Sequence, residues 1–316
     1  MITGGTGFIG NVLIRQLSEL GYPIKLVIRP SKRSPNIPKG VSLDVTITSL
    51  TDSKGLQAAM KGVDVIFHLA SAESLGREAQ LSTVDIKGTA TLVEAASQSN
   101  IKRIFYLSHL GSDQASAYPL LKAKGIAEQT IKASKIPYTI FRSSMAFGDK
   151  DHFTNGLAFL LKVSPYLVML PDDGSVLLQP IWVEDLARIM AWSLDMPQTI
   201  NETFDVGGPE YLSFREICTL IAQKIKINRY YQNVPPVYLN MLTEFLEIIT
   251  PNFPTSVFWL DYLAANRTTS LDILPRQFSL IPARMSQRLG HLEGKKILKP
   301  LWKILIKRKR TTIRWD

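Results

Sequence analysis

The chain has 316 residues, 45% hydrophobic and 20% charged, which is typical of a globular protein with a large buried core. Ordinary contents of glycine and proline, 19 and 18 residues, exclude collagen-like and disordered classes. A single cysteine, Cys218, excludes an internal disulfide, and the four scattered histidines offer no metal-ligand spacing. We therefore expect a protein of a reducing compartment, without a metal site.

The formal net charge of +10 is concentrated at one end of the chain. Residues 288–316 hold ten Lys and Arg against two acids, a net +8, which leaves +2 for the first 287 residues. Since the basic residues form a tail and not a folded face, nucleic acid is not the expected partner. The chain start lacks the regions of a secretory signal, and no apolar run reaches the roughly 18 residues of a transmembrane helix. The expected location is cytoplasmic, or peripheral on the inner face of a membrane.

Short apolar runs and amphipathic stretches alternate through the first half of the chain. The apolar runs predict buried strands over residues 24–28, 63–69, 103–107 and 138–141. The amphipathic stretches predict helices over residues 9–20, 53–60, 83–98 and 121–133. This alternation is typical of an α/β protein with a Rossmann-type, doubly wound parallel sheet.

After residue 150 the alternation weakens, and repeated prolines break the chain into short helices and loops. We expect residues 1–150 to form the NAD(P)-binding domain, with residues 176–206 returning to it. Residues 151–175 and 207–290 would form a smaller, mostly helical C-terminal substrate domain. Residues 291–316 would form a basic amphipathic tail.

Three glycines open the chain with the spacing GxxGxxG, followed by an amphipathic helix and a strand. In nucleotide-binding units the first glycine permits a tight turn, the second lets a pyrophosphate approach the backbone, and the third allows close helix–sheet packing. The helix start offers N–H groups to the phosphates. The same pattern can be a tight turn without a ligand, but its context favours a nucleotide. The predicted loop consists of Gly4, Thr6, Gly7, Phe8, Ile9 and Gly10.

The residue expected to select the cofactor is Arg29, at the end of the second predicted strand. Enzymes that use NAD usually place an acid about 20 residues after the glycine motif, where it binds the ribose 2′-hydroxyl. Arg29, with Lys32 and Arg33 close behind, can instead pair with a 2′-phosphate. NADP is therefore the expected cofactor, with NAD as the alternative, and a solvated basic loop is the competing interpretation.

A series of motifs follows in order along the chain: TGGTGFIG, SLTD, GVDVIFHLAS, VDIKGTATLVEAA, RIFYLSHLGS, IPYTIFRSSMAFG, QPIWVEDLA and FDVGGPEYLSFREI. Together they resemble the extended and atypical short-chain dehydrogenase/reductase superfamily, whose members include epimerase/dehydratase-like proteins. The chain looks most similar to the branch that contains the dehydrogenase-like accessory subunit of respiratory complex I and its bacterial relatives. The resemblance covers about residues 1–285 and leaves the tail without a counterpart.

This resemblance implies a cofactor that crosses the sheet edge from adenine to nicotinamide. It places Ser49 and Leu50 beside the adenine, Ala70 and Ser71 along the cofactor, and Ser143 and Ser144 near the nicotinamide. The sequence departs from the family at two positions. Ser49 stands where an acid is usual, and Asp85 stands where an asparagine is usual.

Family enzymes use a Tyr-x-x-x-Lys pair on one helix, in which the lysine lowers the pKa of the tyrosine for proton transfer while hydride moves at the nicotinamide. Two registers fit this sequence. Tyr118 and Lys122 have the literal spacing, whereas alignment of PLLKAKGIAEQ puts Leu120 at the tyrosine and Lys124 at the lysine. Pro119 favours a helix start directly after Tyr118, and with it the second register, in which the tyrosine is missing.

In that register Lys124 would orient the nicotinamide ribose. Ser108 and His109 end the strand from which family enzymes draw a serine, and His109 is a candidate substitute acid–base because its ordinary pKa is about 6.5. Alternatively, His109 only bonds a neighbouring loop. His68 is expected to be a packed histidine and not a catalyst. The candidate catalytic residues are thus Lys124, Tyr118, Lys122, Ser108 and His109.

Two functions remain open at this point. One is an NADP(H)-dependent oxidoreductase or epimerase/dehydratase-type enzyme that acts on an unidentified small molecule. The other is a non-catalytic nucleotide-binding accessory, assembly or redox-sensing protein of a membrane complex. Residues 295–310, KKILKPLWKILIKRKR, combine eight cations with aliphatic residues and Trp302, a composition suited to an anionic membrane surface. A membrane complex, an acidic protein partner, an inert solvated tail and incidental nucleic-acid contact are the alternatives.

Overall fold

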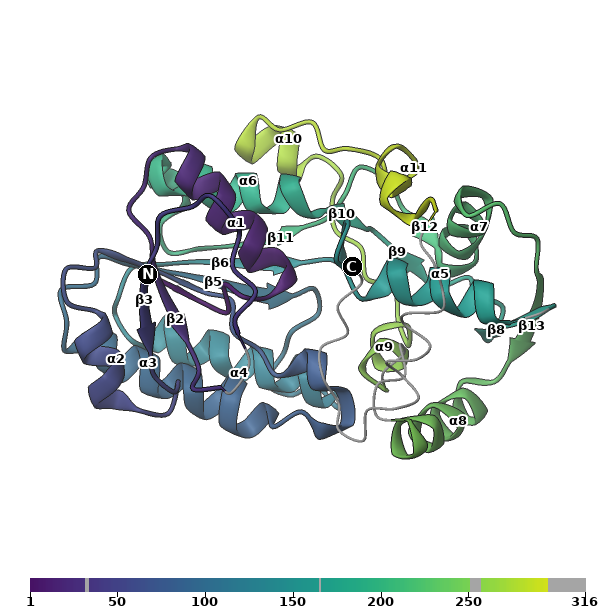
Figure 1. Cartoon of the computed structure of the whole chain (residues 1–316), viewed down its shortest axis with the longest axis horizontal. Coiled ribbons are helices and arrows are strands. Elements are labelled where there is room, and N and C mark those ends of the chain that lie inside the picture. Colours follow the sequence, from purple (N-terminus) through teal and green to yellow (C-terminus); the bar gives the residue numbers. More distant parts are fainter. Residues whose placement is uncertain (32–33, 165, 251–256, 295–316) are drawn as a thin grey trace.

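The computed structural model of the chain describes residues 1–31, 34–164, 166–250 and 257–294. At its centre lies a seven-stranded parallel sheet with the strand order β11-β6-β5-β4-β1-β2-β3 (Figure 1). Its strands are β1 (Ile2–Thr3), β2 (Lys25–Ile28), β3 (Asp44–Ile47), β4 (Val65–His68), β5 (Arg103–His109), β6 (Tyr138–Ser143) and β11 (Glu202–Val206). The prediction of a Rossmann-type parallel sheet is confirmed.

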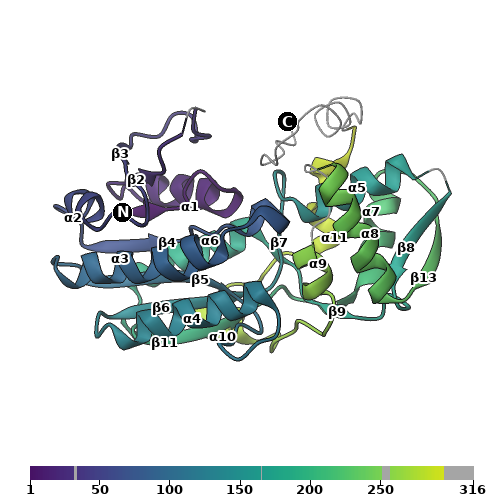
Figure 2. The same cartoon turned by 90° about the horizontal axis from the view of Figure 1, so that it is seen from below.

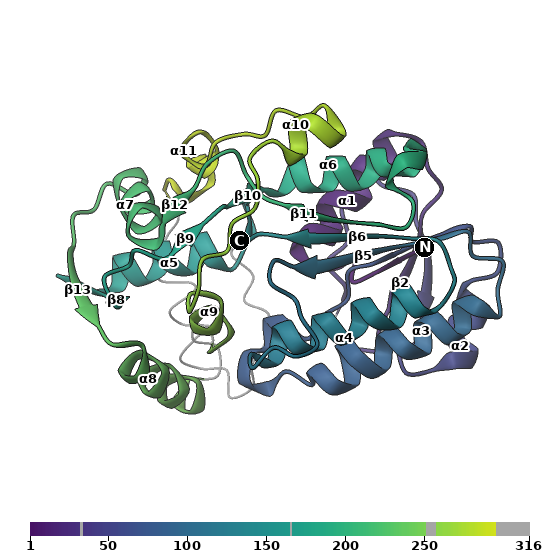
Figure 3. The ribbon, with the colours of Figure 1, turned by 180° about the vertical axis from the view of Figure 1, so that it is seen from behind.

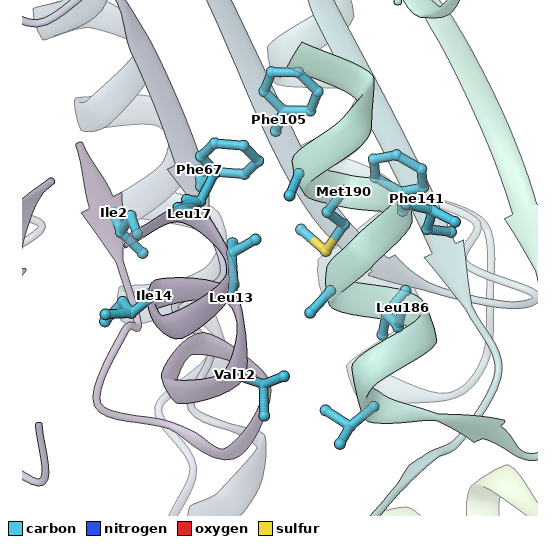
Figure 4. Close-up of a cluster of buried hydrophobic side chains, with 14 of the residues drawn as sticks. Ile2, Val12, Leu13, Ile14, Leu17, Phe67, Phe105, Phe141, Leu186 and Met190 are labelled. Carbon is cyan, nitrogen blue, oxygen red and sulfur yellow. The ribbon is translucent and has the colours of Figure 1, made fainter. Parts of the chain in front are cut away.

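Helices cover both faces of the sheet and give the three layers of a doubly wound fold (Figures 1 and 2). One face carries α2 (Ser53–Ala59), α3 (Gly88–Ser97) and α4 (Pro119–Ala133); the other carries α1 (Phe8–Glu19), α6 (Val183–Trp192) and α10 (Ile273–Phe278). On the second face, Leu13 of α1 and Met190 of α6 share a buried cluster with Phe105 and Phe141 of the sheet (Figure 4). Because the inner strands are covered on both faces, they read as continuous apolar runs.

The structure departs from the predicted elements at several places; for example, α4 begins at Pro119, two residues before the helix predicted over 121–133. The helix expected over residues 83–98 begins as a π-helical turn, η2 (Ser82–Lys87), before α3. Strand β3 escaped prediction because three of its four residues are exposed at the sheet edge, without a buried apolar run. Strands β5 and β6 continue two residues beyond their predicted ends, which brings His109 and Ser143 to the end of the sheet.

A smaller, mostly helical part lies beside the sheet (Figure 1). It contains α5 (Phe153–Val163), α7 (Phe214–Lys224), α8 (Pro236–Ile249), α9 (Val257–Tyr262), α11 (Met285–Arg288) and the turn η5 (Leu289–Leu292). Its strands pair as β8 (Leu167–Pro171) with β13 (Tyr230–Val234) and β9 (Leu177–Leu178) with β12 (Leu212–Ser213). This part has its own hydrophobic core, in which Cys218 is fully buried and burial raises the pKa of its thiol to about 12.

The chain passes between the two parts several times. Strand β7 (Ala146–Phe147) pairs with β10 (Ile181–Trp182), after which α6, the turns η3 (Ser193–Asp195) and η4 (Pro197–Thr199), and β11 lie with the sheet. Helix α10 also packs there, since Leu274 and Phe278 belong to the cluster shared with α1 and α6. Of the described helices, none is long and apolar enough to cross a membrane.

A buried arginine fastens the end of α6 to the sheet. Arg103 of β5 is 6% exposed, and its guanidinium donates to the Ser193 carbonyl at 2.9 Å, to Thr139 Oγ1 at 3.0 Å and to Thr199 Oγ1 at 2.5 Å. The same group lies 4.4 Å from the centre of the Phe105 ring. Its removal would leave several buried acceptors without a donor.

We predict that Arg103→Met lowers the free energy of unfolding by about 2–3 kcal/mol, because unsatisfied buried polar groups cost about 1–3 kcal/mol each. Urea denaturation measures this change. The control is Arg276→Met, which removes an exposed pair with Asp272 of 3.7 Å N–O distance and should change stability by less than about 0.5 kcal/mol. Equal effects of the two substitutions would contradict the role given to Arg103.

Candidate cofactor site at the strand ends

The carboxyl ends of the parallel strands point toward the smaller part of the molecule, as the arrowheads of β5 and β6 show (Figures 1 and 3). The strand order reverses at β1, which has β2 on one side and β4 on the other. Open α/β sheets bind their ligands outside the strand ends at such a reversal. From β3 across to β6, these ends carry Ser49 and Leu50, Arg29, Gly4, Ala70 and Ser71, His109, and Ser143. The structure therefore places the predicted cofactor residues in a row along the carboxyl ends of the strands.

The glycine loop sits tightly at the centre of this edge. Gly4 has a φ of +75°, and a Cβ there would lie 2.6 Å from the backbone nitrogen of Ala70. A Cβ on Gly10 would lie 2.5 Å from the Gly4 carbonyl oxygen. Helix α1 begins at Phe8 without a side-chain cap and without an acid in its first turn. Its first N–H groups and the positive end of its dipole thus face a site suited to phosphate.

The side of the site expected to face the adenine lies at β2 and β3. Arg29 follows β2 directly and is exposed, which fits the role predicted for it, whereas Lys32 and Arg33 lie outside the described residues. Ser49 shares a 2.9 Å hydrogen bond with the Thr51 hydroxyl. Leu50 packs near α3, since a Cβ on Gly88 would lie 3.1 Å from the Leu50 Cβ.

Lys124 of α4 is held in a buried ion pair. It is 3% exposed, and its Nζ lies 3.4 Å from Oδ1 of Asp85 and 3.5 Å from the carbonyl oxygen of Leu107. Burial alone would lower the pKa of Lys124, but the facing groups of Tyr106, Asp85 and Glu73 outweigh burial and raise it. The side chain therefore stays an ammonium ion whose charge is balanced inside the protein.

The two possible tyrosine–lysine registers are distinct in the structure. Helix α4 begins at Pro119, and Tyr118 is its N-cap residue with extended backbone. Lys122 is exposed, whereas Lys124 is buried. Leu120, at the position that the resemblance gives the tyrosine, is 5% exposed and carries no proton to donate.

Two further polar residues from the sequence analysis are bonded inside the fold. Ser108 is 1% exposed and donates to Oε1 of Glu128 at 2.5 Å. His68 is fully buried, and each ring nitrogen hydrogen-bonds a threonine hydroxyl. Burial, helped by the charge of Lys124, lowers the pKa of His68 to about 3. His68 is thus a neutral, packed histidine, and the hydroxyl of Ser108 is hydrogen-bonded to the buried carboxylate of Glu128.

His109 at the end of β5 has a different environment. Its Nε2 lies 2.9 Å from Oε2 of Glu73 in the turn η1 (Glu73–Glu78), while its buried Nδ1 has no partner among the described residues. Burial would raise the pKa of Glu73, but the nearby His109, Lys124 and His152 lower it to about 2. The ring of Tyr262 from α9 lies edge-on to His109, with ring centres 6.2 Å apart. The Glu73 carboxylate therefore fixes the orientation of the His109 ring at the strand ends.

Ser143 and Ser144 lie at the end of β6, where the chain passes from the sheet to the smaller part. The Ser143 hydroxyl donates to the Ser144 carbonyl at 2.7 Å, and the Ser144 hydroxyl donates to the Gln179 carbonyl at 2.5 Å. The Gln179 side chain in turn donates to the Gly208 carbonyl and accepts from the Thr269 amide. Ser144 therefore fastens the Gln179 segment to the end of β6, whereas the Ser143 hydroxyl bonds only the neighbouring backbone.

Sequence reasoning missed Glu73 and Tyr262. Glu73 follows the strand-end segment 70–72 directly, and an acid so soon after a strand end is a signal that could have identified it. Tyr262 has no such local signal, because α9 reaches η1 and His109 only through tertiary packing.

Comparison with known proteins agrees with this geometry. Residues 4–159 match the family model described as NAD(P)H-binding. The Photosystem II assembly factor Ycf39 of Trieres chinensis is 25% identical over 246 residues, covering 77% of this chain and 74% of the relative. The mitochondrial NADH dehydrogenase (ubiquinone) 1 alpha subcomplex subunit 9 of Arabidopsis thaliana is 25% identical over 282 residues, covering 85% of this chain and 70% of the relative.

A solved structure with a similar fold is the Citrobacter sp. triphenylmethane reductase complexed with NADP(H). The two superpose with a TM-score of 0.72 at 18% identity, covering 92% of this chain and 99% of the reductase. The parallel sheet, the glycine loop and the ordered motifs all agree with these matches. Residues 4–159 form an NAD(P)H-binding domain, and over most of its length the chain is similar to proteins of the extended short-chain dehydrogenase/reductase type.

Proposed function

We propose that the chain is an NADP(H)-binding accessory or assembly protein of a membrane complex, which holds the nucleotide and does not turn it over. The observation that carries this proposal is the buried pair of Lys124 and Asp85, since the lysine expected at the nicotinamide ribose is 3% exposed and already paired. Leu120 adds no proton donor on the same helix. Two relatives, described as an assembly factor and as an NADH dehydrogenase subunit, support the proposal.

The proposed preference for NADP(H) rests on Arg29. We predict that NADPH binds more tightly than NADH and that Arg29→Asp reduces or reverses this preference. A lost bond to the charged 2′-phosphate should cost about 1.5–3 kcal/mol. Fluorescence titration with both nucleotides measures it, and Arg276→Asp, with the same charge change on the exposed side of α10, is the control. Equal affinities in the unsubstituted chain would refute the preference.

The buried pair allows a test of whether Lys124 serves the fold or the nucleotide. We predict that Lys124→Met and Asp85→Leu each lower the free energy of unfolding by about 3–5 kcal/mol, because each leaves a buried charge unpaired. The double variant should recover most of that loss and bind NADPH with nearly unchanged affinity. Denaturation of all four proteins, with NADPH titration of those that fold, measures both effects. A folded double variant with about tenfold weaker NADPH binding would restore Lys124 as a ribose ligand.

A second candidate function, an NADP(H)-dependent reductase, is favoured by the pair of His109 and Glu73. The Glu73 carboxylate, 2.9 Å from Nε2, orients the imidazole of His109. The Nδ1 atom of His109 has no partner among the described residues and can exchange a proton with a substrate. In this reading the cofactor supplies the hydride. His109 acts as the acid in place of the missing tyrosine, and the substrate is a small carbonyl compound.

Turnover separates the two functions. With NADPH and a panel of small ketones, aldehydes and quinones, we predict no nucleotide oxidation above the rate without protein. Sustained oxidation that His109→Gln lowers about 10²-fold or more, while Tyr118→Phe leaves it unchanged, would replace the accessory function by the reductase. A comparable loss in Tyr118→Phe would instead identify Tyr118 and Lys122 as the working pair.

The basic tail is the proposed attachment of the chain to its membrane partner. Its eight cations in residues 295–310 lie outside the described residues, so the support comes from the sequence alone. Each cation close to an anionic leaflet contributes about 1 kcal/mol to the free energy of binding. Together, the cations can hold the chain at the surface without a segment that spans the bilayer.

A further inference from the structure

Helix α8 packs with its polar side inward and its apolar side outward. Leu239, Thr243 and Glu247, spaced four residues apart, face the protein with 8%, 8% and 5% of their surface exposed. Two of these three inward residues are polar. Most of the remaining surface of the helix is apolar and exposed: Val237 66%, Tyr238 65%, Met241 65%, Phe245 58%, Ile248 60% and Ile249 63%. We call these six residues the α8 face.

This arrangement is the reverse of a surface helix in a water-soluble domain, which turns its apolar stripe to the core. Single exposed apolar residues are ordinary, but a continuous group of them marks a surface that binds an apolar partner. Glu244 is the one acid exposed on α8, and the helix contains no lysine or arginine. Six large apolar side chains on four turns therefore lack a cover within the described residues.

Helix α8 lies along the lower edge of the smaller part, apart from the helices that cover the sheet (Figures 1 and 3). Among the described elements it packs against α9 and follows β13 directly. The α8 face is thus not part of the cofactor site. An occupant can reach it without touching the strand ends.

The charge of the chain favours a lipid surface as this occupant. The last described residues, after η5, lie on the same small part, because η5 packs against α5 and α7. The tail that continues from Gly294 brings eight cations and no acid in residues 295–310. A second copy carries the same cationic tail and is repelled by it, whereas an anionic leaflet neutralises the charge of the tail. Tyr238 and Phe245 also suit the lipid interface.

We propose that α8 lies in the plane of an anionic bilayer, with its apolar face inserted at the boundary between headgroups and acyl chains. Interfacial helices bind in this way, through apolar contact strengthened by electrostatic attraction. The inference deepens the tail attachment proposed above and is independent of whether the nucleotide is turned over. It assigns the apolar contact to α8 and leaves the charge attraction to the tail.

The test uses the full chain with vesicles of phosphatidylcholine and phosphatidylglycerol in a flotation assay, at low salt and at about 1 M salt, where exposed charges are screened beyond about 3 Å. The variant is Met241→Gln, Phe245→Gln and Ile248→Gln together. Its matched control is Ile47→Gln with Ile281→Gln, at residues 68% and 89% exposed elsewhere. We expect the α8 variant to lose about tenfold in vesicle affinity at both salts, and the control to bind as the unsubstituted chain does. Thermal unfolding and NADPH titration establish that both variants fold.

Three outcomes would overturn the proposal. One is equal vesicle binding by the α8 variant and the control. In another, a chain that ends at residue 294 loses all vesicle binding while the α8 variant binds as the unsubstituted chain does. The tail alone would then attach the protein to the membrane. The third is a dimer of the unsubstituted chain that becomes monomeric in the α8 variant while vesicle binding persists, which would make the face a contact between copies. In support, the emission that Phe245→Trp adds to that of the five native tryptophans, obtained as the difference from the unsubstituted chain, should be blue-shifted on vesicles and quenched by brominated lipid.

Discussion

The buried ion pair between Lys124 and Asp85 organises the end of the sheet where the cofactor residues meet. Asp85 lies in the π-helical turn before α3, and its second oxygen accepts the N–H of Ala72 in the segment after β4. Lys124 comes from α4 and lies 5.4 Å from the ring centre of Tyr106 on β5. One pair therefore joins two helices, one strand and one loop in a region from which water is excluded. In such a region a partner is obligatory, because a lone buried charge is far more costly than a paired one.

The same cation sets the charge of its surroundings. It adds to burial in keeping His68 neutral, and it helps hold the Glu73 carboxyl ionised beside His109. Burial raises the pKa of Tyr106 to about 12 despite the opposing charge of Lys124, so that hydroxyl keeps its proton. The interior beneath the strand ends thus has fixed protonation states. His109 and Glu73 lie closer to the surface, where their side chains are 21% and 38% exposed.

The fold was largely readable from the sequence, because alternating apolar runs and amphipathic stretches determine a doubly wound sheet and the glycine spacing marks its first turn. Pro119 likewise gave the correct start of α4 and separated Lys122 from Lys124. The edge strand β3 was missed because an exposed strand needs no apolar run. The π-helical turn was missed because its composition is that of an ordinary helix. Glu73 and Tyr262 join the site through loop and interdomain packing, which no spacing along the chain encodes.

Cys218, the only cysteine of the chain, is buried in the core of the smaller part. This core is separate from the two hydrophobic clusters that cover the sheet. A fully buried thiol with a pKa of about 12 reacts with a disulfide reagent only after the surrounding core has opened. The rate of Cys218 modification in the unsubstituted protein therefore reports the opening of this part alone. Measured with and without nucleotide, that rate shows whether a ligand at the strand ends changes how often this core opens.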